Sequence, residues 1–163
     1  MGTSKITAEP GSLQILVERE FDAPADVLLR AHTDPELLKQ WMGPDGLSME
    51  IPTFEPRDGG RWDWVFTGPD GDVQRFHGVT HGTPSVENGI LGTFEWLGLP
   101  GHVSFQTMTF DEHDGRTTLR SNSVFQTLED RDGMIASGME SGMNEGYAKL
   151  DKLVTTLTST EKK

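Results

Sequence analysis

The stretch GMESGMNEGYAKLDKL, residues 138–153, has glycines at positions 138, 142 and 146 in a pattern that otherwise predicts a helix. Each glycine in a helix interior costs about 1 kcal/mol relative to alanine. Two explanations compete: another part of the chain packs very close to the glycines, or the glycines leave space for something else. The surrounding residues show which face of the helix the glycines occupy.

These surroundings predict one long amphipathic helix, from about residue 130 to residue 157. At about 100° per residue, one broad face contains the apolar side chains Ile135, Met139, Met143, Tyr147, Leu150, Leu153, Val154 and Leu157. The charged residues Glu140, Asp151 and Lys152 fall on the opposite side. The helix is therefore expected to lie along a sheet. Because Gly138 lies at the edge of the apolar face and Gly146 near its middle, we favour the interpretation that the glycines leave space.

The segment LQILVEREF, residues 13–21, predicts the first strand, because it is rich in β-forming residues and its alternate side chains are mostly apolar. Two short helices are expected after it. Asp22 can cap the first, and Thr33 can cap the second in the capping box TDPE, residues 33–36. The second helix is expected to run to Trp41, where GPDG (43–46) ends it.

The middle of the chain predicts strands joined mostly by hairpins. The Asp-Gly or Asn-Gly pairs at 70–71, 88–89 and 114–115 are strong hairpin signals. With the first strand, we expect about seven strands, the other six within 47–55, 59–67, 73–84, 88–98, 102–112 and 117–128. The fold class is α+β, with a curved antiparallel sheet wrapped around the C-terminal helix. Residues 13–157 are expected to form one domain between mobile tails at 1–12 and 158–163.

Composition limits the possible functions. The chain of 163 residues has no cysteine, which excludes disulfides, thiolate nucleophiles and cysteine-bound metals. A formal net charge of −12 argues against non-specific binding to nucleic acid or anionic lipid. No apolar run approaches the roughly 20 residues that span a bilayer, and the N-terminus lacks the apolar core of a signal peptide. A cytoplasmic protein is expected, either a monomer or a weak homodimer.

Aromatic residues are the most informative feature of the predicted strands. Trp62, Trp64 and Phe66 alternate and therefore share one face of one strand. These rings either form the core or line a hollow between the sheet and the last helix, where flexible methionines could adapt to a ligand. The candidate ligand-binding residues are Trp41, Trp62, Trp64, Phe66, Phe76, Phe94, Trp96, Phe105, Met139 and Met143.

No catalytic or metal-binding motif is evident. His77 and His81 share a face of one predicted strand, but zinc needs three or four convergent ligands and no H-E-x-x-H occurs. His32, His102 and His113 lie near turns or helix ends, where solvated histidines are common. The chain has no G-x-S-x-G elbow and no phosphate-binding loop. We predict no cofactor and no metal site.

Acid–base chemistry needs only one or two positioned groups, so it stays open. The candidates for such a role are Asp63, Glu95, His77 and Arg19, although Asp63 is expected to face solvent. Ser121 and Ser123 would be polar groups inside the hollow if their strand face points inward.

Four segments in the same order resemble one family: EREFDAP (18–24), HTDPELLKQW (32–41), GGRW (59–62) and ASGMESGMNEGYAKLDKL (136–153). They are similar to bacterial proteins that resemble the C-terminal domain of the activator of Hsp90 ATPase, within the START-like (SRPBCC) superfamily. This resemblance implies a helix-grip fold, in which the sheet encloses a deep cavity beside the long helix. Members of the superfamily bind lipids, sterols, polyketides or hormones, and some are cyclases or hydratases.

Three functions therefore compete. The first is binding of a small hydrophobic molecule, aromatic, polyketide-like or lipid-like, in the cavity. The second is an enzyme of the cyclase or hydratase kind that uses the same cavity. The third is a protein-interaction module like the Hsp90 activator, although this chain lacks the separate N-terminal domain of the eukaryotic activator.

Overall fold

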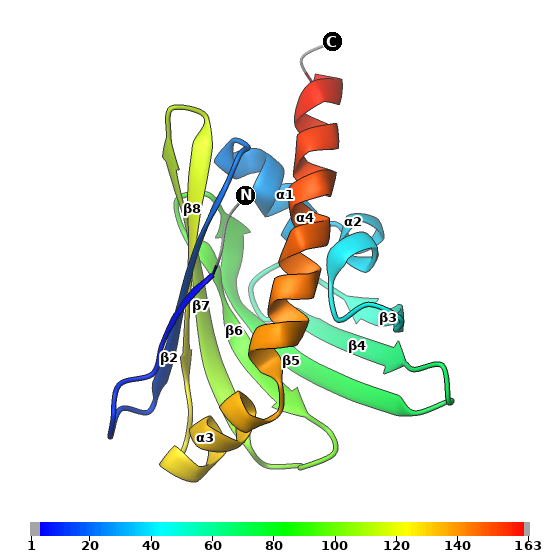
Figure 1. Ribbon diagram of the computed structural model, residues 1–163, viewed down its shortest axis with the longest axis vertical. Coiled ribbons are helices and arrows are strands. Elements are labelled where there is room, and N and C mark those ends of the chain that lie inside the picture. The colour runs from blue at the N-terminus through cyan, green and yellow to red at the C-terminus, as the bar shows by residue number, and fades with distance from the viewer. Residues whose placement is uncertain (1–3, 162–163) are drawn as a thin grey trace.

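A computed structural model describes residues 4–161 and shows an α+β fold in which a curved antiparallel sheet holds a long C-terminal helix (Figure 1). The strands are β1 Lys5–Thr7, β2 Gln14–Phe21, β3 Ser48–Phe54, β4 Arg61–Thr67, β5 Val73–Ser85, β6 Gly89–Trp96, β7 Val103–His113 and β8 Arg116–Val124. The helices are α1 Ala25–Thr33, α2 Pro35–Trp41, α3 Leu128–Ala136 and α4 Met139–Glu161. The predicted fold class is confirmed.

The sheet has the strand order β1-β2-β8-β7-β6-β5-β4-β3, and every neighbouring pair is antiparallel. Strands β3 to β8 follow one another, as the hairpin signals predict. At the β7–β8 turn, Asp114 and Gly115 both have positive φ, 53° and 78°, which is the conformation of a type I′ turn. The sheet has eight described strands rather than the seven predicted, because β1 is added to its edge.

β1 lies within the segment that we expected to be a mobile tail. Ile6 packs against a small cluster formed by Ile15, Val17 and Phe125. Farther along, the buried Arg131 of α3 donates hydrogen bonds from Nη1 to the backbone oxygens of Glu9 and Ser12, at 2.6 and 2.7 Å. These contacts hold residues 5–12 against β2 and α3, and a three-residue strand is too short to produce a recognisable sequence pattern. Residues 1–3 and 162–163 of the predicted tails lie outside the described residues. At the other end, α4 continues to Glu161, beyond the predicted domain boundary at residue 157.

The two short helices have the predicted positions, but their caps differ from the prediction. Pro24, rather than Asp22, is the N-cap of α1 and provides no side-chain hydrogen bond. Asp34, rather than Thr33, caps α2, where its Oδ1 accepts from the backbone N–H of Glu36 at 2.9 Å. Thr33 belongs to α1, where its hydroxyl donates to the backbone oxygen of Leu29.

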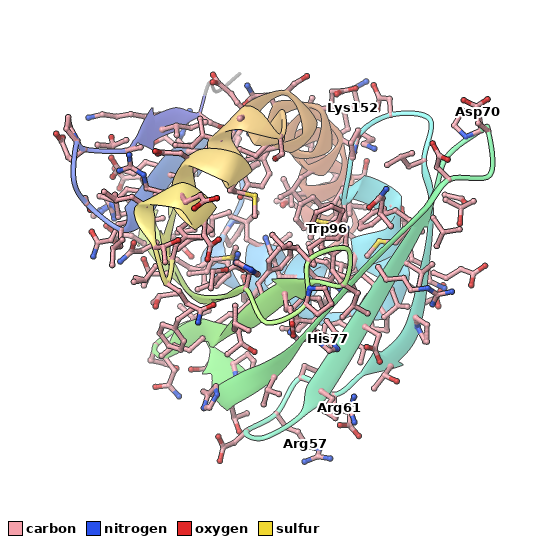
Figure 2. The ribbon with its side chains drawn as sticks, turned by 90° about the horizontal axis from the view of Figure 1, so that it is seen from below. Arg57, Arg61, Asp70, His77, Trp96 and Lys152 are labelled. Carbon is pink, nitrogen blue, oxygen red and sulfur yellow. The ribbon has the colours of Figure 1, made fainter. Side chains whose placement is uncertain are left out.

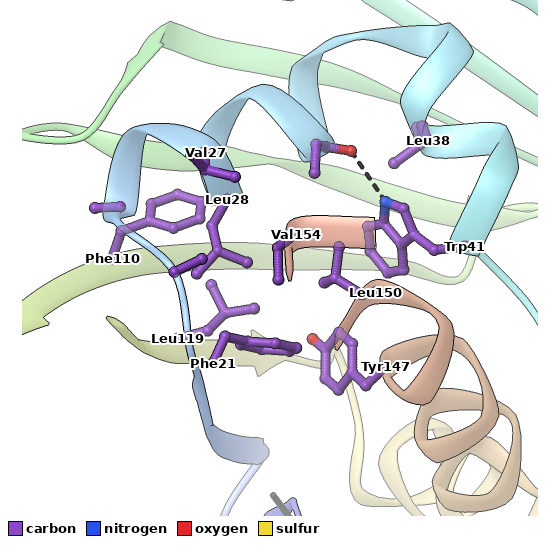
Figure 3. Close-up of a cluster of buried hydrophobic side chains, with 13 residues drawn as sticks. Phe21, Val27, Leu28, Leu38, Trp41, Phe110, Leu119, Tyr147, Leu150 and Val154 are labelled. Atoms are coloured by element: carbon purple, nitrogen blue, oxygen red, sulfur yellow. Dashed lines mark hydrogen bonds between the residues drawn. The ribbon is translucent and has the colours of Figure 1, made fainter. Parts of the chain in front are cut away.

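The core occupies the end of the molecule where α1 and α2 pack against α4 (Figure 3). Phe21, Leu28 and Leu150 have no measurable exposure. Trp41 belongs to the same cluster, and its indole N–H donates to the backbone oxygen of Ala31 at 3.0 Å (Figure 3). The C-terminal half of α4 therefore supplies core contacts, which leaves its N-terminal half to face the remaining part of the sheet.

The predicted single C-terminal helix is divided in two. Gly138 has φ +87°, which a right-handed helix does not allow, and it separates α3 from α4. The apolar pattern continues through this position, so periodicity alone predicts no break. Gly138 is therefore needed because its backbone has a positive φ. Neither of the two competing explanations, close packing or empty space, included this role.

The other two glycines lie against the chain that follows α2. A Cβ on Gly146 would lie 3.1 Å from the backbone oxygen of Trp41 and 3.5 Å from the nitrogen of Gly43. A Cβ on Gly142 would lie 3.4 Å from Cγ of Pro44. Close packing therefore explains Gly146 better than the space-leaving interpretation that we favoured. The partner in that packing is backbone rather than the predicted tryptophans.

Substitution of Gly138 by alanine is expected to lower the free energy of unfolding by about 1 kcal/mol, because a Cβ is unfavourable at positive φ. Gly133, inside α3, is the matched control: its φ is not positive and a Cβ there meets nothing within 4 Å. Gly133→Ala is expected to raise the free energy of unfolding by about 0.5–1 kcal/mol. Urea denaturation measures both, and effects of the same sign would contradict this account of Gly138.

None of the helices in the described part of the chain is both long enough and apolar enough to span a membrane.

Candidate functional site

Two adjoining pockets lie between the concave face of the sheet and the helices. The inner pocket has a volume of about 350 Å³, and its lining includes Ile15, Val17, Trp62, Met139, Met143 and Gly146. The outer pocket has a volume of about 950 Å³, and its lining includes Phe66, Phe76, Trp96, Leu99, Phe125 and Met134. Trp64 and Phe94 line both pockets, as do Met42 and Gly43. Pockets of this size and apolar character are typical of sites for small molecules.

All of the predicted ligand-binding residues except Phe105 line one of the pockets. The inner pocket is lined by Trp41, Trp62, Trp64, Phe94, Met139 and Met143. The outer pocket is lined by Trp64, Phe66, Phe76, Phe94 and Trp96. The sequence pattern thus identified the face of the sheet that encloses space, and strand alternation is the reason.

Phe105 lies on the other face of the sheet. It is 40% exposed, and its ring centroid lies 6.4 Å from that of His81. Its neighbours in β7, Ser104 and Gln106, line the pockets instead. The prediction grouped Phe105 with the aromatic residues of the other strands, but Phe105 is not among the described residues that line either pocket.

The aromatic rings of the pockets contact one another in a continuous row. The ring centroids of Trp62 and Trp64 are 4.2 Å apart, and those of Trp62 and Phe94 are 5.9 Å apart. Phe76 continues the row, with its centroid 5.2 Å from that of Phe94. Gly78 makes this arrangement possible, since a Cβ there would overlap the backbone oxygen of Thr93 and would lie 2.6 Å from Cζ2 of Trp62. Sequence reasoning missed the role of Gly78, which depends on contact across strands.

Trp96 stands at the exposed side of the outer pocket. In Figure 2 it lies between the sheet and α4, on the inner side, whereas Arg57 and Arg61 lie at the far edge of the sheet. Its indole N–H donates to Oε1 of Gln74 at 2.8 Å, and 41% of its surface is exposed. Trp96 therefore presents an immobilised ring to any molecule that enters the outer pocket.

Sequence reasoning missed His32, which was expected to be solvated. His32 is 8% exposed, lines the inner pocket and packs against the rings of Trp41 and Phe110, at 4.8 and 5.7 Å between centroids. Its Nδ1–H donates to the backbone oxygen of Leu28 at 2.7 Å. A signal was available, because His32 lies one turn after Leu28 on the apolar face of α1.

Burial determines the protonation of His32. The loss of hydration lowers the pKa of its imidazole to about 4, and this effect exceeds that of the hydrogen bond to Leu28, which acts in the opposite direction. The ring is therefore neutral at pH 7. Because Nδ1 carries the proton that Leu28 accepts, Nε2 has a free lone pair. Nε2 is buried and has no hydrogen-bond partner in the part of the chain that the structure describes.

The remaining polar groups of the inner pocket are uncharged. Thr80, Thr93, Gln106, Thr107, Ser121 and Ser123 contribute to its lining, so the two serines do point inward. Tyr147 also lines it, and burial raises the pKa of its hydroxyl to about 12, so this group is neutral at pH 7. The indole N–H of Trp64 is buried and has no hydrogen-bond partner among the described residues. No Asp, Glu, Lys or Arg side chain is among the described residues that line this pocket.

Three of the groups considered for acid–base chemistry lie on the outer face of the sheet. Asp63, His77 and Glu95 directly neighbour pocket-lining residues along their strands, and successive side chains point to opposite faces. His77 Nε2 lies 2.6 Å from Oε1 of Glu95. Hydrogen bonds from the N–H of Gly101 and then from His77 lower the pKa of Glu95. These groups stabilise the sheet surface and do not reach the pockets.

Arg19, the fourth candidate, forms part of the core. Its guanidinium donates to both carboxylate oxygens of Asp151 in α4, at 2.9 and 2.8 Å. Its Cζ also lies 4.6 Å from the ring centroid of Phe21 and 5.6 Å from that of Tyr147. Asp151 was predicted on the solvent side of the helix, and this pairing corrects that expectation.

The described residues contain no group of three or more His, Asp or Glu side chains arranged to hold a metal ion. His102 Nδ1 instead lies 2.6 Å from Oδ1 of Asp130, at the edge of the outer pocket. His113 pairs with Asp111 in the β7–β8 hairpin.

Comparison with known families agrees with this architecture. The family model described as "Activator of Hsp90 ATPase homolog 1-like protein" matches residues 22–155. The chain belongs to this family. It therefore has the START-like fold, as the resemblance implied, and this fold is used generally for ligand-binding or Hsp90-activator-like domains.

Solved structures of similar shape come from several bacteria. A protein from Rhodobacter sphaeroides, known from a crystal structure, is 28% identical in sequence to this chain. The match covers 94% of this chain and 99% of the other, with a TM-score of 0.85. A solution structure from Arthrobacter aurescens is 25% identical with a TM-score of 0.83, and the coverages are 93% and 91%. A protein from Mycobacterium smegmatis, known from a crystal structure, shares the fold with a TM-score of 0.82. It is 22% identical to this chain, and the match covers 94% of this chain and 97% of the other. A search of curated proteins found no match.

Proposed function

We propose that this protein binds a small hydrophobic molecule, with an aromatic or polycyclic skeleton, in the inner and outer pockets. The observation that supports this most directly is the unfilled space beside the aromatic row of Trp62, Trp64 and Phe94. Flat rings that are already held in place by contacts with one another can pack against a planar ligand with little further loss of side-chain entropy. Met139 and Met143 on the opposite wall can adapt to its outline.

Thermal unfolding in the presence of a ligand panel tests this proposal. The panel should contain naphthalene derivatives, flavonoids, polycyclic polyketides, sterols and fatty acids. A ligand at 100 times its Kd is expected to stabilise the protein by about 2.7 kcal/mol. Unchanged melting curves with every class in the panel would contradict ligand binding.

Filling the inner pocket is expected to remove binding without unfolding the protein. Ser123→Leu places a larger apolar side chain into the pocket, and overlap with a ligand should weaken binding about tenfold or more, since overpacking costs about 1–3 kcal/mol. Thr109→Leu is the control, because Thr109 is exposed and lies on the outer face of the sheet. Isothermal titration calorimetry with a ligand from the panel compares the two variants. Equal affinities would place the ligand elsewhere.

The enzyme alternative gains one observation, because His32 is a titratable side chain in the inner pocket. A base with a pKa of about 4 removes protons poorly at neutral pH, so this group is better suited to accept a hydrogen bond. The Hsp90-activator alternative requires a surface that docks a protein, and its binding should be the same for Ser123→Leu and the native chain. A monomer or weak dimer in the cytoplasm remains our prediction.

A further inference from the structure

Two residues that line the inner pocket each carry a buried polar atom that no group within the described residues 4–161 satisfies. Nε2 of His32, from α1, and Nε1 of Trp64, from β4, have no hydrogen-bond partner, and both residues line the pocket. An unsatisfied buried polar group costs about 1–3 kcal/mol, so such atoms in a pocket are natural positions for ligand contacts.

The two atoms have opposite hydrogen-bonding roles. The bond from Nδ1–H of His32 to the oxygen of Leu28 fixes the tautomer, so Nε2 can only accept a hydrogen bond. The indole N–H of Trp64 can only donate. Trp41 provides a contrast, because its indole N–H already donates to the oxygen of Ala31. The packing of His32 between the rings of Trp41 and Phe110 holds the imidazole in one orientation.

The charge of the ligand is also restricted. None of the described residues lining the inner pocket is an Asp, Glu, Lys or Arg. An ionised group that entered would lose its hydration without meeting a counter-charge, which is strongly unfavourable. Burial keeps His32 itself uncharged at neutral pH, with its pKa lowered to about 4.

We infer that the ligand of the inner pocket is a neutral hydroxylated arene, a phenol or polyphenol, whose O–H donates to Nε2 of His32. An oxygen of the same ligand accepts from the indole N–H of Trp64, while its rings contact Trp62 and Phe94. This inference rests on the proposed function and adds the chemical class of the ligand and the residue that selects it. Carboxylate lipids are excluded from the inner pocket by the same reasoning.

Three probes of nearly equal shape test the inference: 2-naphthol, 2-methylnaphthalene and 2-naphthoate. In calorimetric titrations at pH 7.5, 2-naphthol is expected to bind about tenfold more tightly than 2-methylnaphthalene, which is the effect of one net hydrogen bond. 2-Naphthoate is expected to bind more weakly than either. Equal affinities of the first two probes would overturn the inference and leave the proposed function standing. Absence of binding by all three would overturn the inference, and it would overturn the proposed function as well if the wider panel also left the melting curve unchanged.

A pair of variants assigns the preference to His32. In His32→Asn, the side-chain amide can still donate to the backbone oxygen of Leu28, but it is too short to reach the position that Nε2 occupies. In His32→Gln, the longer side chain can bring its amide oxygen, an acceptor, to that position. The tenfold ratio between the affinities for 2-naphthol and 2-methylnaphthalene should fall to about one in His32→Asn and be partly retained in His32→Gln. The ratio is compared because replacing the imidazole changes the pocket wall for both probes. A preference that persists in His32→Asn would overturn the assignment.

The nitrogen resonances of His32 provide a readout that needs no variant. When 2-naphthol binds, the ¹⁵N signal of Nε2 should move in the direction expected for a neutral imidazole nitrogen that accepts a hydrogen bond, and 2-methylnaphthalene should not produce this shift. An unchanged Nε2 signal with 2-naphthol bound would contradict the contact, even if His32→Asn failed to fold.

Discussion

Replacing Asp151 with alanine is expected to lower the free energy of unfolding by about 2–3 kcal/mol, below the roughly 3–5 kcal/mol found when a fully buried ion pair loses one partner, because 26% of the Asp151 side chain is exposed. Arg19 is 6% exposed, and both nitrogens of its guanidinium fork donate to Asp151 at 2.8–2.9 Å. Loss of the carboxylate removes this counter-charge from a cation that is surrounded by Phe21 and Tyr147. Since the pair joins β2 to α4, the loss also weakens the attachment of the helix to the sheet.

Urea denaturation measures this effect, and Glu20→Ala is the matched control. Glu20 pairs with Arg116 at 2.6 Å on the surface, where side chains are 52% and 41% exposed, so its removal should cost less than about 1 kcal/mol. The double variant Arg19→Met/Asp151→Leu should recover most of the lost stability, because it leaves no buried charge. A difference below about 1 kcal/mol between Asp151→Ala and Glu20→Ala would contradict this account of the pair.

Stability is expected to decrease by roughly 3 kcal/mol as the pH falls from 6.5 to 4, because of His32 alone. In the unfolded chain, this imidazole takes up a proton near its ordinary pKa of 6.5. In the folded protein its pKa is lowered to about 4 by burial, so between these values the unfolded state binds the proton and the folded state does not. The contribution of neutral His32 is therefore fully present above pH 6.5 and is lost below it.

The difference between the native protein and His32→Asn isolates this effect. Groups such as Glu95 titrate in both proteins, so their contributions cancel in the difference between the two free energies of unfolding. This difference should change by roughly 3 kcal/mol between pH 7 and pH 4, with the native protein losing more stability. Parallel curves for the two proteins would show that His32 titrates normally in the folded state.

Much of the fold could be predicted from local patterns. Asn-Gly and Asp-Gly pairs positioned the hairpins because few other residues tolerate the positive φ of tight turns. The alternation of Trp62, Trp64 and Phe66 identified the inner face of β4, because strand geometry fixes which side chains share a face.

The errors concern features that depend on contacts between distant parts of the chain. In β7, the set Ser104, Gln106, Met108 and Phe110 faces inward and the alternate set containing Phe105 faces outward, although each set contains one phenylalanine. This choice is made by the pairing of β7 with β6 and β8, which local sequence does not contain. The break at Gly138 was hidden because the apolar pattern continues across it.

The candidate site was predicted in its apolar part and missed in its polar part. Large aromatic side chains are visible in any alternating strand. By contrast, whether His32 is a solvated or a buried histidine depends on how α1 packs against Trp41 and Phe110. The glycines of α4 illustrate the same limit, because Gly146 is required by the backbone of Trp41, about a hundred residues earlier in the chain.

The central claim, a ligand held beside the aromatic row, is tested most directly by the four indole N–H signals of the ¹⁵N-labelled protein during a titration with 2-naphthol. The signals of Trp62 and Trp64 are expected to shift progressively and to saturate, with the larger change at Trp64, whose N–H has no partner in the protein. Trp41, bonded to Ala31, should shift less. Movement of the Trp96 signal alone, or of none of the four, would contradict the claim.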